Sequence, residues 1–221
     1  MLQKIGQYKK NEKMEMKKYQ FTADWFGSTD EISKILPIGT TQKLEILEIG
    51  SYEGRSTIWF LENLLNNKES YITCVDPWQD YSQDKESLNS YNSENAEWKF
   101  EKLKIFDKFL YNVEISEQKE KFEIKKGLST KILPELINQN RQFDVIFIDG
   151  NHVAPSVLMD TVLCWNLLKK DGILIFDDYL WMPHLDKTLT PKLAIDSFLE
   201  IFEGYYEPIL DSYRKAIKKI N

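Results

Sequence analysis

The chain has 221 residues, of which 42% are hydrophobic and 29% charged, a composition typical of one globular domain rather than a disordered chain. Its formal net charge of −6 argues against a general nucleic-acid binder, which is normally basic. No apolar run approaches the roughly 20 residues of a membrane span, and the N-terminus lacks the apolar core of a signal peptide. We therefore expect a cytoplasmic protein with neither a membrane nor a nucleic-acid partner.

Residues 1–40 are predicted as an N-terminal helical segment, with a charged leader over 1–20 and an aromatic turn before a short helix over 21–36. Trp25 and Phe26 in this turn either pack in the core or line a substrate pocket. Residues 41–221 are expected to form one further domain. The two cysteines, Cys74 and Cys164, lie in apolar runs without CxxC spacing, which favours buried free thiols over a zinc site or disulfide.

From residue 44 onward, short apolar runs alternate with helical patterns. Five runs are predicted as strands: 44–49, 71–76, 122–126, 143–149 and 172–178. The clearest helices are expected after Ser129, which suits an N-cap, over 155–169, and after Thr190-Pro191. The C-terminal tail can supply two more strands around a turn near Asp211-Ser212.

Strands alternating with helices imply parallel pairing through right-handed crossovers. Nearly continuous apolar strands indicate a sheet covered on both faces by helices. The predicted fold is therefore α/β, a Rossmann-like doubly wound sheet of about seven mostly parallel strands, with the last strand antiparallel. Residues 79–115 interrupt the alternation with a polar, aromatic-rich insertion, which is either a lid over a site or a surface helix pair.

Ligands of such sheets bind outside the carboxyl ends of the strands. The first strand ends in the sequence EIGSYEGRS, residues 48–56, where Gly50 permits a turn and Gly54 permits a close helix start. The second strand ends in Asp76, 26 residues beyond Gly50, and an acid there can accept both hydroxyls of a ribose.

This segment resembles motif I of class I S-adenosylmethionine-dependent methyltransferases, in a methyltransferase-domain subfamily. The resemblance continues in order over residues 44–180, through the segments CVDPW, KKGLSTKILPEL, FDVIFIDGNH and LKKDGILIFDDY. It implies that residues 41–221 are a methyltransferase catalytic domain, with 79–115 as a lid-like insertion. The cofactor would be S-adenosylmethionine.

The resemblance also assigns the cofactor-binding positions. Glu48 and Gly50 would lie near the amino-acid part, Asp76 would bind the ribose, and Asp149 would lie beneath the methionine moiety or reach the acceptor. The loop around the cofactor would comprise Ser51, Tyr52, Glu53, Gly54 and Ser56. The adenine would be flanked by Pro77, Trp78, Gly127, Leu128 and Ser129. The alternative is that Glu48 and Asp76 have only a structural role, in which each strand-end acid is hydrogen-bonded to a local loop.

A dinucleotide is the competing ligand. Its fingerprint, GxGxxG, needs a second glycine to admit the pyrophosphate, and Tyr52 occupies that position here. A sulfonium cofactor has no phosphate and does not require that glycine. A nicotinamide-dependent oxidoreductase is therefore the disfavoured alternative, together with a non-catalytic cofactor-binding or interaction module.

Methyl transfer to a hydroxyl requires removal of its proton, and two routes are visible. Asp149, Asp177 and Asp178 end adjacent strands and can converge on a hard cation such as Mg²⁺. Catechol-type and macrocin-type O-methyltransferases use acids at comparable positions, and the Asp-Asp pair here is nearer the macrocin pattern. The alternative is that these acids only cap loops.

The second route is His152, whose imidazole suits a general base at neutral pH. His184 is a weaker candidate. We thus expect His152 and Asp149 to act in methyl transfer to a small-molecule acceptor, with a hydroxyl as the favoured acceptor group and a divalent metal as an optional aid. The sequence is compatible with either a monomer or a homo-oligomer. Tyr179 and Trp181 either line the acceptor pocket or pack in the core, and Asp160 is interpreted as a solvated or loop-binding acid.

Overall fold

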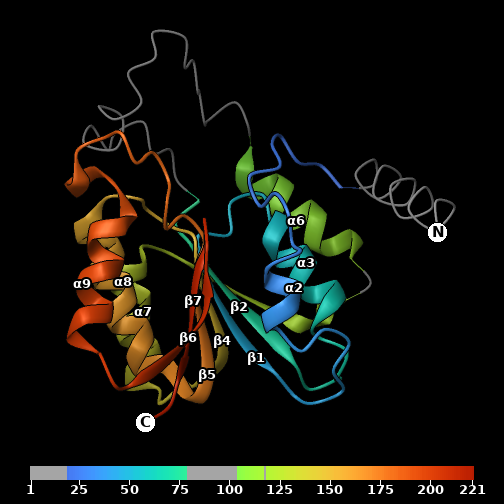
Figure 1. The fold of residues 1–221 in the computed structure, drawn as a ribbon. Helices are drawn as coiled ribbons and strands as arrows, with labels where there is room; N and C mark the ends of the chain where they lie inside the picture. The colour runs from blue at the N-terminus through green and yellow to red at the C-terminus, as the bar shows by residue number, and fades with distance from the viewer. Residues whose placement is uncertain (1–18, 79–103, 117) are drawn as a thin grey trace, which may run out of the picture.

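The computed structural model describes residues 19–78, 104–116 and 118–221 (Figure 1). Within them, one sheet has the strand order β3-β2-β1-β4-β5-β7-β6. The strands are β1 Glu45–Ile49, β2 Tyr71–Asp76, β3 Phe122–Lys126, β4 Phe143–Ile148, β5 Leu168–Phe176, β6 Tyr206–Asp211 and β7 Lys215–Lys219. Pairing is parallel from β3 to β5, and β7 lies antiparallel to both β5 and β6. The predicted doubly wound α/β sheet with an antiparallel last strand is confirmed.

Helices cover both faces of this sheet. They are α2 Ile32–Ile35, α3 Arg55–Asn63, α6 Ile105–Ile115, α7 Ser129–Asn138, α8 Ala154–Leu167 and α9 Pro191–Ile201, with 3₁₀ turns η2 Lys119–Lys121 and η3 Lys187–Leu189. Figure 1 shows α7, α8 and α9 on one face and α2, α3 and α6 on the other. Two apolar cores result, one beneath each helical layer. None of the described helices is both long and apolar enough to cross a membrane.

The burial of the strands explains their composition. The central strands β1, β2 and β4 are buried along almost their whole length, whereas the edge strands β3 and β6 are only partly buried. A strand covered on both faces must be apolar at consecutive positions, because neither face meets water. The runs ILEI and YITCV largely meet this condition, and their buried polar residues Glu48 and Thr73 are hydrogen-bonded. Cys74 and Cys164 are buried free thiols, as expected.

The largest boundary error lies between α8 and β5. We expected the helix to reach residue 169 and the strand to begin at 172, but α8 ends at Leu167 and β5 begins at Leu168. Leu168 is extended, with φ −81° and ψ 125°, and pairs with Phe143 before the register shifts. The error arises because an apolar run does not show by its pattern where a buried helix becomes a buried strand.

A second correction concerns the start of α7. Ser129 is the first helical residue rather than the N-cap, which is Leu128 and offers no capping side chain. Of the N-terminal segment 1–40, the described part contains only the four-residue helix α2, and residues 1–18 lie outside the described residues. Of the insertion 79–115, residues 79–103 lie outside as well, while α6 packs Phe109 and Val113 into the core.

Candidate active site

The carboxyl ends of β1, β4 and β5 meet where the strand order reverses between β1 and β4. In an open parallel sheet this reversal leaves a crevice, because the following loops depart to opposite faces. Backbone hydrogen bonds tie the strand ends together: the Asp149 N–H donates to the Ile49 carbonyl at 2.8 Å, and the Asp177 N–H donates to the Ile148 carbonyl at 3.1 Å. The acids that follow β4 and β5 are thereby placed beside the loop that follows β1.

Gly50 is required by a close approach between two of these loops. Its φ is +87°, and a Cβ at this position would lie 1.9 Å from the Asp149 carbonyl oxygen. Its N–H donates to the Val75 carbonyl at 2.9 Å. Gly54, with φ +83°, is the N-cap of α3, and a Cβ there would lie 3.1 Å from the Phe109 ring. Both glycines therefore serve backbone and core packing around the loop.

Glu48 is buried beneath the loop. It accepts hydrogen bonds from the hydroxyls of Ser51 at 2.6 Å, Ser56 at 2.5 Å and Thr57 at 2.5 Å. Burial raises the pKa of its carboxyl, and the three hydroxyls act in the opposite direction. We expected Glu48 beside the cofactor. The structure shows that it holds the loop through these three hydroxyls, and its place beside the cofactor stays a prediction.

Asp76, the last residue of β2, binds the loop that follows β1. Its carboxylate accepts the Tyr52 N–H at 3.0 Å and the Trp78 N–H at 2.6 Å. The Trp78 indole N–H in turn donates to the Tyr52 carbonyl at 2.8 Å. The strand-end acid and the loop after β1 are thus joined at Tyr52.

Tyr52 itself has φ +47°. Its hydroxyl is buried and has no hydrogen-bond partner among the described residues. Burial, and then the charges of Glu53 and Asp76, raise the pKa of Tyr52 to about 12. In the dinucleotide fingerprint this sequence position is the second glycine, which admits the pyrophosphate.

Glu53 is bound by partners from the N-terminal segment and α6, which the sequence did not indicate. It accepts the N–H and hydroxyl of Thr22, each at 2.5 Å, and Lys108 at 2.9 Å. The Asn112 side chain donates to the Glu53 carbonyl at 2.8 Å. Glu53 therefore joins the loop to the N-terminal segment and to α6. These partners lie far away in sequence, so no local pattern predicts them.

The remaining predicted cofactor positions follow β2 and β3. Trp78 is 8% exposed and packs against Phe106 and Phe109 of α6, at ring-centroid distances of 5.0 and 4.7 Å, with Pro77 just before it. The Gly127 N–H donates to the Asp76 carbonyl at 3.0 Å, which brings the loop after β3 to the end of β2. Leu128 is exposed, and Ser129 follows it as the start of α7.

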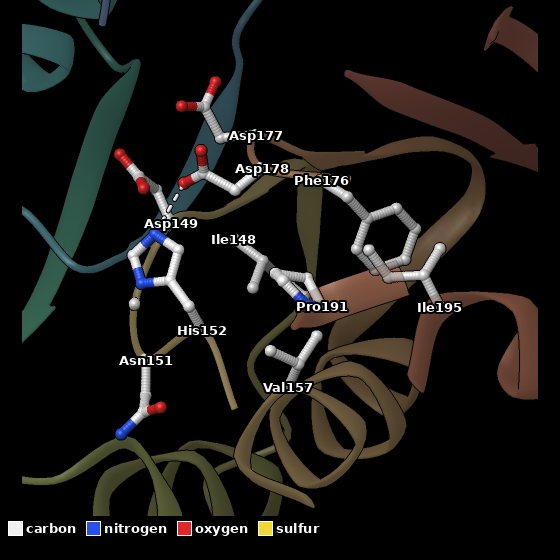
Figure 2. A pocket seen from close by; sticks show the side chains of 11 residues that line it. Ile148, Asp149, Asn151, His152, Val157, Phe176, Asp177, Asp178, Pro191 and Ile195 are labelled. Carbon is white, nitrogen blue, oxygen red and sulfur yellow. Dashed lines mark hydrogen bonds and ion pairs between the residues drawn. The ribbon is translucent and has the colours of Figure 1, made fainter. Parts of the chain in front are cut away.

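Asp149, His152 and Asp178 form a compact group at the ends of β4 and β5. One nitrogen of His152 and one oxygen of each carboxylate all lie within 4.8 Å of one another. His152 Nε2 lies 2.8 Å from Asp178 Oδ2 (Figure 2). All three side chains are partly exposed and line a small cavity with the apolar residues Ile148 and Phe176.

The third expected carboxylate lies apart from this group. Asp177 is 3% exposed, and its Oδ1 accepts a hydrogen bond from the buried Arg214 guanidinium. Burial raises the pKa of Asp177 to about 6, and Arg214 opposes this shift. In Figure 2 its carboxylate points away from His152, while those of Asp149 and Asp178 lie beside the imidazole.

The pKa values of the two clustered carboxyls shift in opposite directions. Burial, followed by the charges of Asp177 and Asp178, raises the pKa of Asp149 well above its ordinary value. Burial acts in the same direction on Asp178, but the hydrogen bond and charge of His152 outweigh it and lower the pKa of that carboxyl. Neighbouring acids with divergent pKa values are common where proton transfer or cation binding occurs.

Two aromatic residues after β5 have different environments. The Trp181 ring lies 4.6 Å from the His152 ring, tilted by 40°, so it contacts the group directly. Tyr179 is 8% exposed and its hydroxyl donates to Asp196 at 2.9 Å, which corresponds to the packing alternative.

Trp25 is 58% exposed and contacts Tyr52 at 4.9 Å, whereas Phe26 is buried in the core. Arg214 and Tyr213, both at this end of the sheet, were not predicted.

Comparisons with known proteins agree with this geometry. A family described as "Methyltransferase domain" matches residues 47–179, which is 133 of the 221 residues. No curated protein matches the chain.

Several solved structures share the fold. An O-methyltransferase from Bacillus cereus in complex with SAH is 19% identical, with a TM-score of 0.55, covering 79% of this chain and 74% of that one. The O-methyltransferase TomG from Streptomyces achromogenes in complex with SAM is 16% identical, with a TM-score of 0.56 and coverage of 82% and 75%. The MycE methyltransferase of the mycinamycin pathway, with Mg and SAH, is 14% identical, with a TM-score of 0.51 and coverage of 81% and 46%.

Proposed function

Because the chain belongs to the methyltransferase-domain family, we propose that it transfers a methyl group from S-adenosylmethionine to a hydroxyl of a small molecule, with His152 as the base. The observation that carries this proposal is the group formed by Asp149, His152 and Asp178 beside the loop after β1. Asp177, an expected metal ligand, is left out because its carboxylate is paired with Arg214.

The cofactor half of the proposal rests on the hydrogen bond between the Tyr52 N–H and the Asp76 carboxylate. The Asp76 carboxylate is oriented by two backbone N–H groups, at Tyr52 and Trp78, so it is held at the end of β2 beside the loop after β1, where it would meet a ribose hydroxyl. Tyr52 excludes a pyrophosphate from the same place. The oxidoreductase alternative is disfavoured on this ground and by the family.

The acceptor half rests on His152. If its Nε2 donates to Asp178 Oδ2, then Nδ1 is the nitrogen that can accept a proton. In the proposed step the acceptor oxygen attacks the methyl carbon in line with the sulfur, the C–S bond breaks, and the hydroxyl proton passes to His152. The neutral thioether S-adenosylhomocysteine leaves. The protein's task is to hold the acceptor at roughly 3 Å and to make its oxygen electron-rich.

A divalent cation fits the two carboxylates. Asp149 has its pKa raised by burial and by neighbouring negative charge, and a bound cation would relieve both. Carboxylate oxygens are the ligands that Mg²⁺ prefers, whereas imidazole is better suited to softer metals. We therefore assign Asp149 and Asp178 as ligands and keep His152 as the base. A bound cation would lower the pKa of the acceptor hydroxyl.

Two measurements test the proposal. In the first, production of S-adenosylhomocysteine is followed over a panel of hydroxyl-bearing compounds, with Mg²⁺ or with a chelator. We expect His152→Asn to lower kcat by about 10²–10⁴-fold, the usual contribution of a positioned base. Wild-type rates that persist in His152→Asn would contradict the assignment of the base.

In the second measurement, Mg²⁺ is titrated while the melting temperature is recorded. The melting temperature should rise for the wild type and remain constant for Asp149→Asn and Asp178→Asn. Asp171→Asn is the matched control, because Asp171 is an exposed acid of β5 paired with Lys218, away from the group. An equal response of Asp178→Asn and wild type would remove the metal from the proposal.

A further inference from the structure

The turn between β6 and β7 reaches the same end of the sheet as the proposed base. Arg214 in this turn is 7% exposed. Its guanidinium donates to Asp177, to the Ser28 carbonyl at 2.7 Å and to the Phe26 carbonyl. The turn is thereby held against the N-terminal segment and the end of β5.

Tyr213 precedes Arg214, and both its backbone and its side chain are held. Its carbonyl accepts the Leu180 N–H at 3.2 Å. Its hydroxyl donates to Asp178 Oδ1 at 3.0 Å, although the residue is 48% exposed. A half-exposed ring contributes little to the core, and the turn needs only the backbone of this residue. The hydroxyl contact with Asp178 is therefore the distinctive feature of the side chain.

Asp178 is thus bound on both oxygens. Tyr213 occupies Oδ1 and His152 occupies Oδ2, at 2.8 Å. The carboxylate torsion of an aspartate is soft, so a single contact would leave the plane of the group free to rotate. Two donors on different oxygens fix the plane, and the plane sets the direction from which the His152 ring is held. Trp181 contacts the face of the same ring.

We infer that Tyr213 is a positioning residue, which orients His152 through Asp178 so that the second imidazole nitrogen faces the acceptor. The phenol has an unperturbed pKa near ~10, so it is protonated at neutral pH and is a donor to the carboxylate. The adjacent acids then have separate roles. Asp177 binds Arg214 and so holds the turn in place, and Asp178 accepts the hydrogen bond from the Tyr213 hydroxyl of that turn. The inference rests on the proposed role of His152 as the base.

The test uses the full chain and the fact that it contains two histidines. Side-chain ¹⁵N spectra are compared for the wild type, Tyr213→Phe and Tyr205→Phe, with His184→Gln used to assign the signals. Phenylalanine keeps the ring and removes only the hydroxyl, so ring-current effects are preserved. Tyr205 is 52% exposed, close to the 48% of Tyr213, and serves as the matched control. His184 is exposed and acts as an internal reference.

We expect the His152 signals to move or broaden in Tyr213→Phe, while the His184 signals stay in place and Tyr205→Phe leaves both histidines unchanged. His152 signals that superimpose on those of the wild type would overturn the inference. This readout does not require turnover, so it stands even if methyl transfer is not detected and the proposed function fails.

Where methyl transfer is detected, a kinetic comparison adds a second criterion. A misdirected base should lower kcat by about ten- to a hundredfold in Tyr213→Phe, with the KM for S-adenosylmethionine unchanged. An unchanged kcat would count against the inference, and a raised cofactor KM alone would show that the tyrosine acts on binding instead.

Discussion

At the scale of single residues, Asp160 shows how burial changes the role of an ordinary acid. The sequence suggested a solvated or loop-binding carboxylate on a helix, but Asp160 is 2% exposed. Its Oδ1 has no hydrogen-bond partner among the described residues. Burial raises its pKa to about 6, and the Ser129 side chain opposes the shift. The solvated alternative is therefore wrong, and the residue lies beneath the loops after β3 and β4.

This shift predicts a pH-dependent gain in stability for Asp160→Asn. Between pH 4 and pH 6 the folded wild type keeps a proton that the unfolded chain, with the ordinary pKa of 3.8, has released. The free energy of unfolding of the wild type therefore falls as the pH rises through this window. Above it, the buried charge costs up to about 3 kcal/mol, from 1.36 kcal/mol for each of the roughly two units.

Asparagine carries no such charge. Urea unfolding of both proteins at several pH values should show a stability difference in favour of Asp160→Asn that grows by about 1–3 kcal/mol from pH 4 to pH 7. A difference that is the same at every pH would show that Asp160 has no raised pKa in the folded protein.

At the scale of elements, the site depends on the close contact between the loops after β1 and β4. Gly50 is the residue that permits it, since its Cβ would overlap the Asp149 carbonyl oxygen at 1.9 Å. Asp149 is also one of the two carboxylates that we assign to the proposed metal, so the same contact places this acid beside the loop after β1.

Gly50→Ala should therefore separate the two loops. Gly204→Ala is the matched control, because Gly204 has φ +85°, close to the +87° of Gly50, and nothing within 4 Å of its virtual Cβ. The control should cost only the left-handed backbone penalty of about 1–2 kcal/mol. Gly50→Ala should cost clearly more and weaken cofactor binding. Equal losses of unfolding free energy in the two variants would mean that the loops do not approach as described.

The sequence predicted those elements that are bounded by local signals. The strands at 71–76 and 122–126 have the predicted bounds, because Pro77 follows the first and Gly127 follows the second. Asp149 and Asp178 were also foreseen, since acids after neighbouring parallel strands share one edge. The ion pair of Asp177 with Arg214 was not, because it depends on the pairing of β7 with β5 across some forty residues. Tyr213 was missed for the same reason.

At the scale of the whole molecule, the fold and the family match are consistent with a methyltransferase. The chain belongs to the methyltransferase-domain family, as the resemblance of its motifs predicted. The three-layer arrangement brings the loop after β1, the acid ending β2 and the group after β4 and β5 to one edge of the sheet (Figure 1).

Binding of S-adenosylhomocysteine, compared with NAD⁺, tests the central claim most directly. The Asp76 carboxylate and the Tyr52 loop should bind the nucleoside thioether and reject the pyrophosphate. At 100 times its dissociation constant, S-adenosylhomocysteine should add about 2.7 kcal/mol to the free energy of unfolding, and NAD⁺ should add none. Asp76→Ala should lose this ligand-induced gain, whatever its own baseline stability, while Asp24→Ala, at an exposed acid, should keep it. Stabilisation by NAD⁺, or an undiminished gain in Asp76→Ala, would contradict the account.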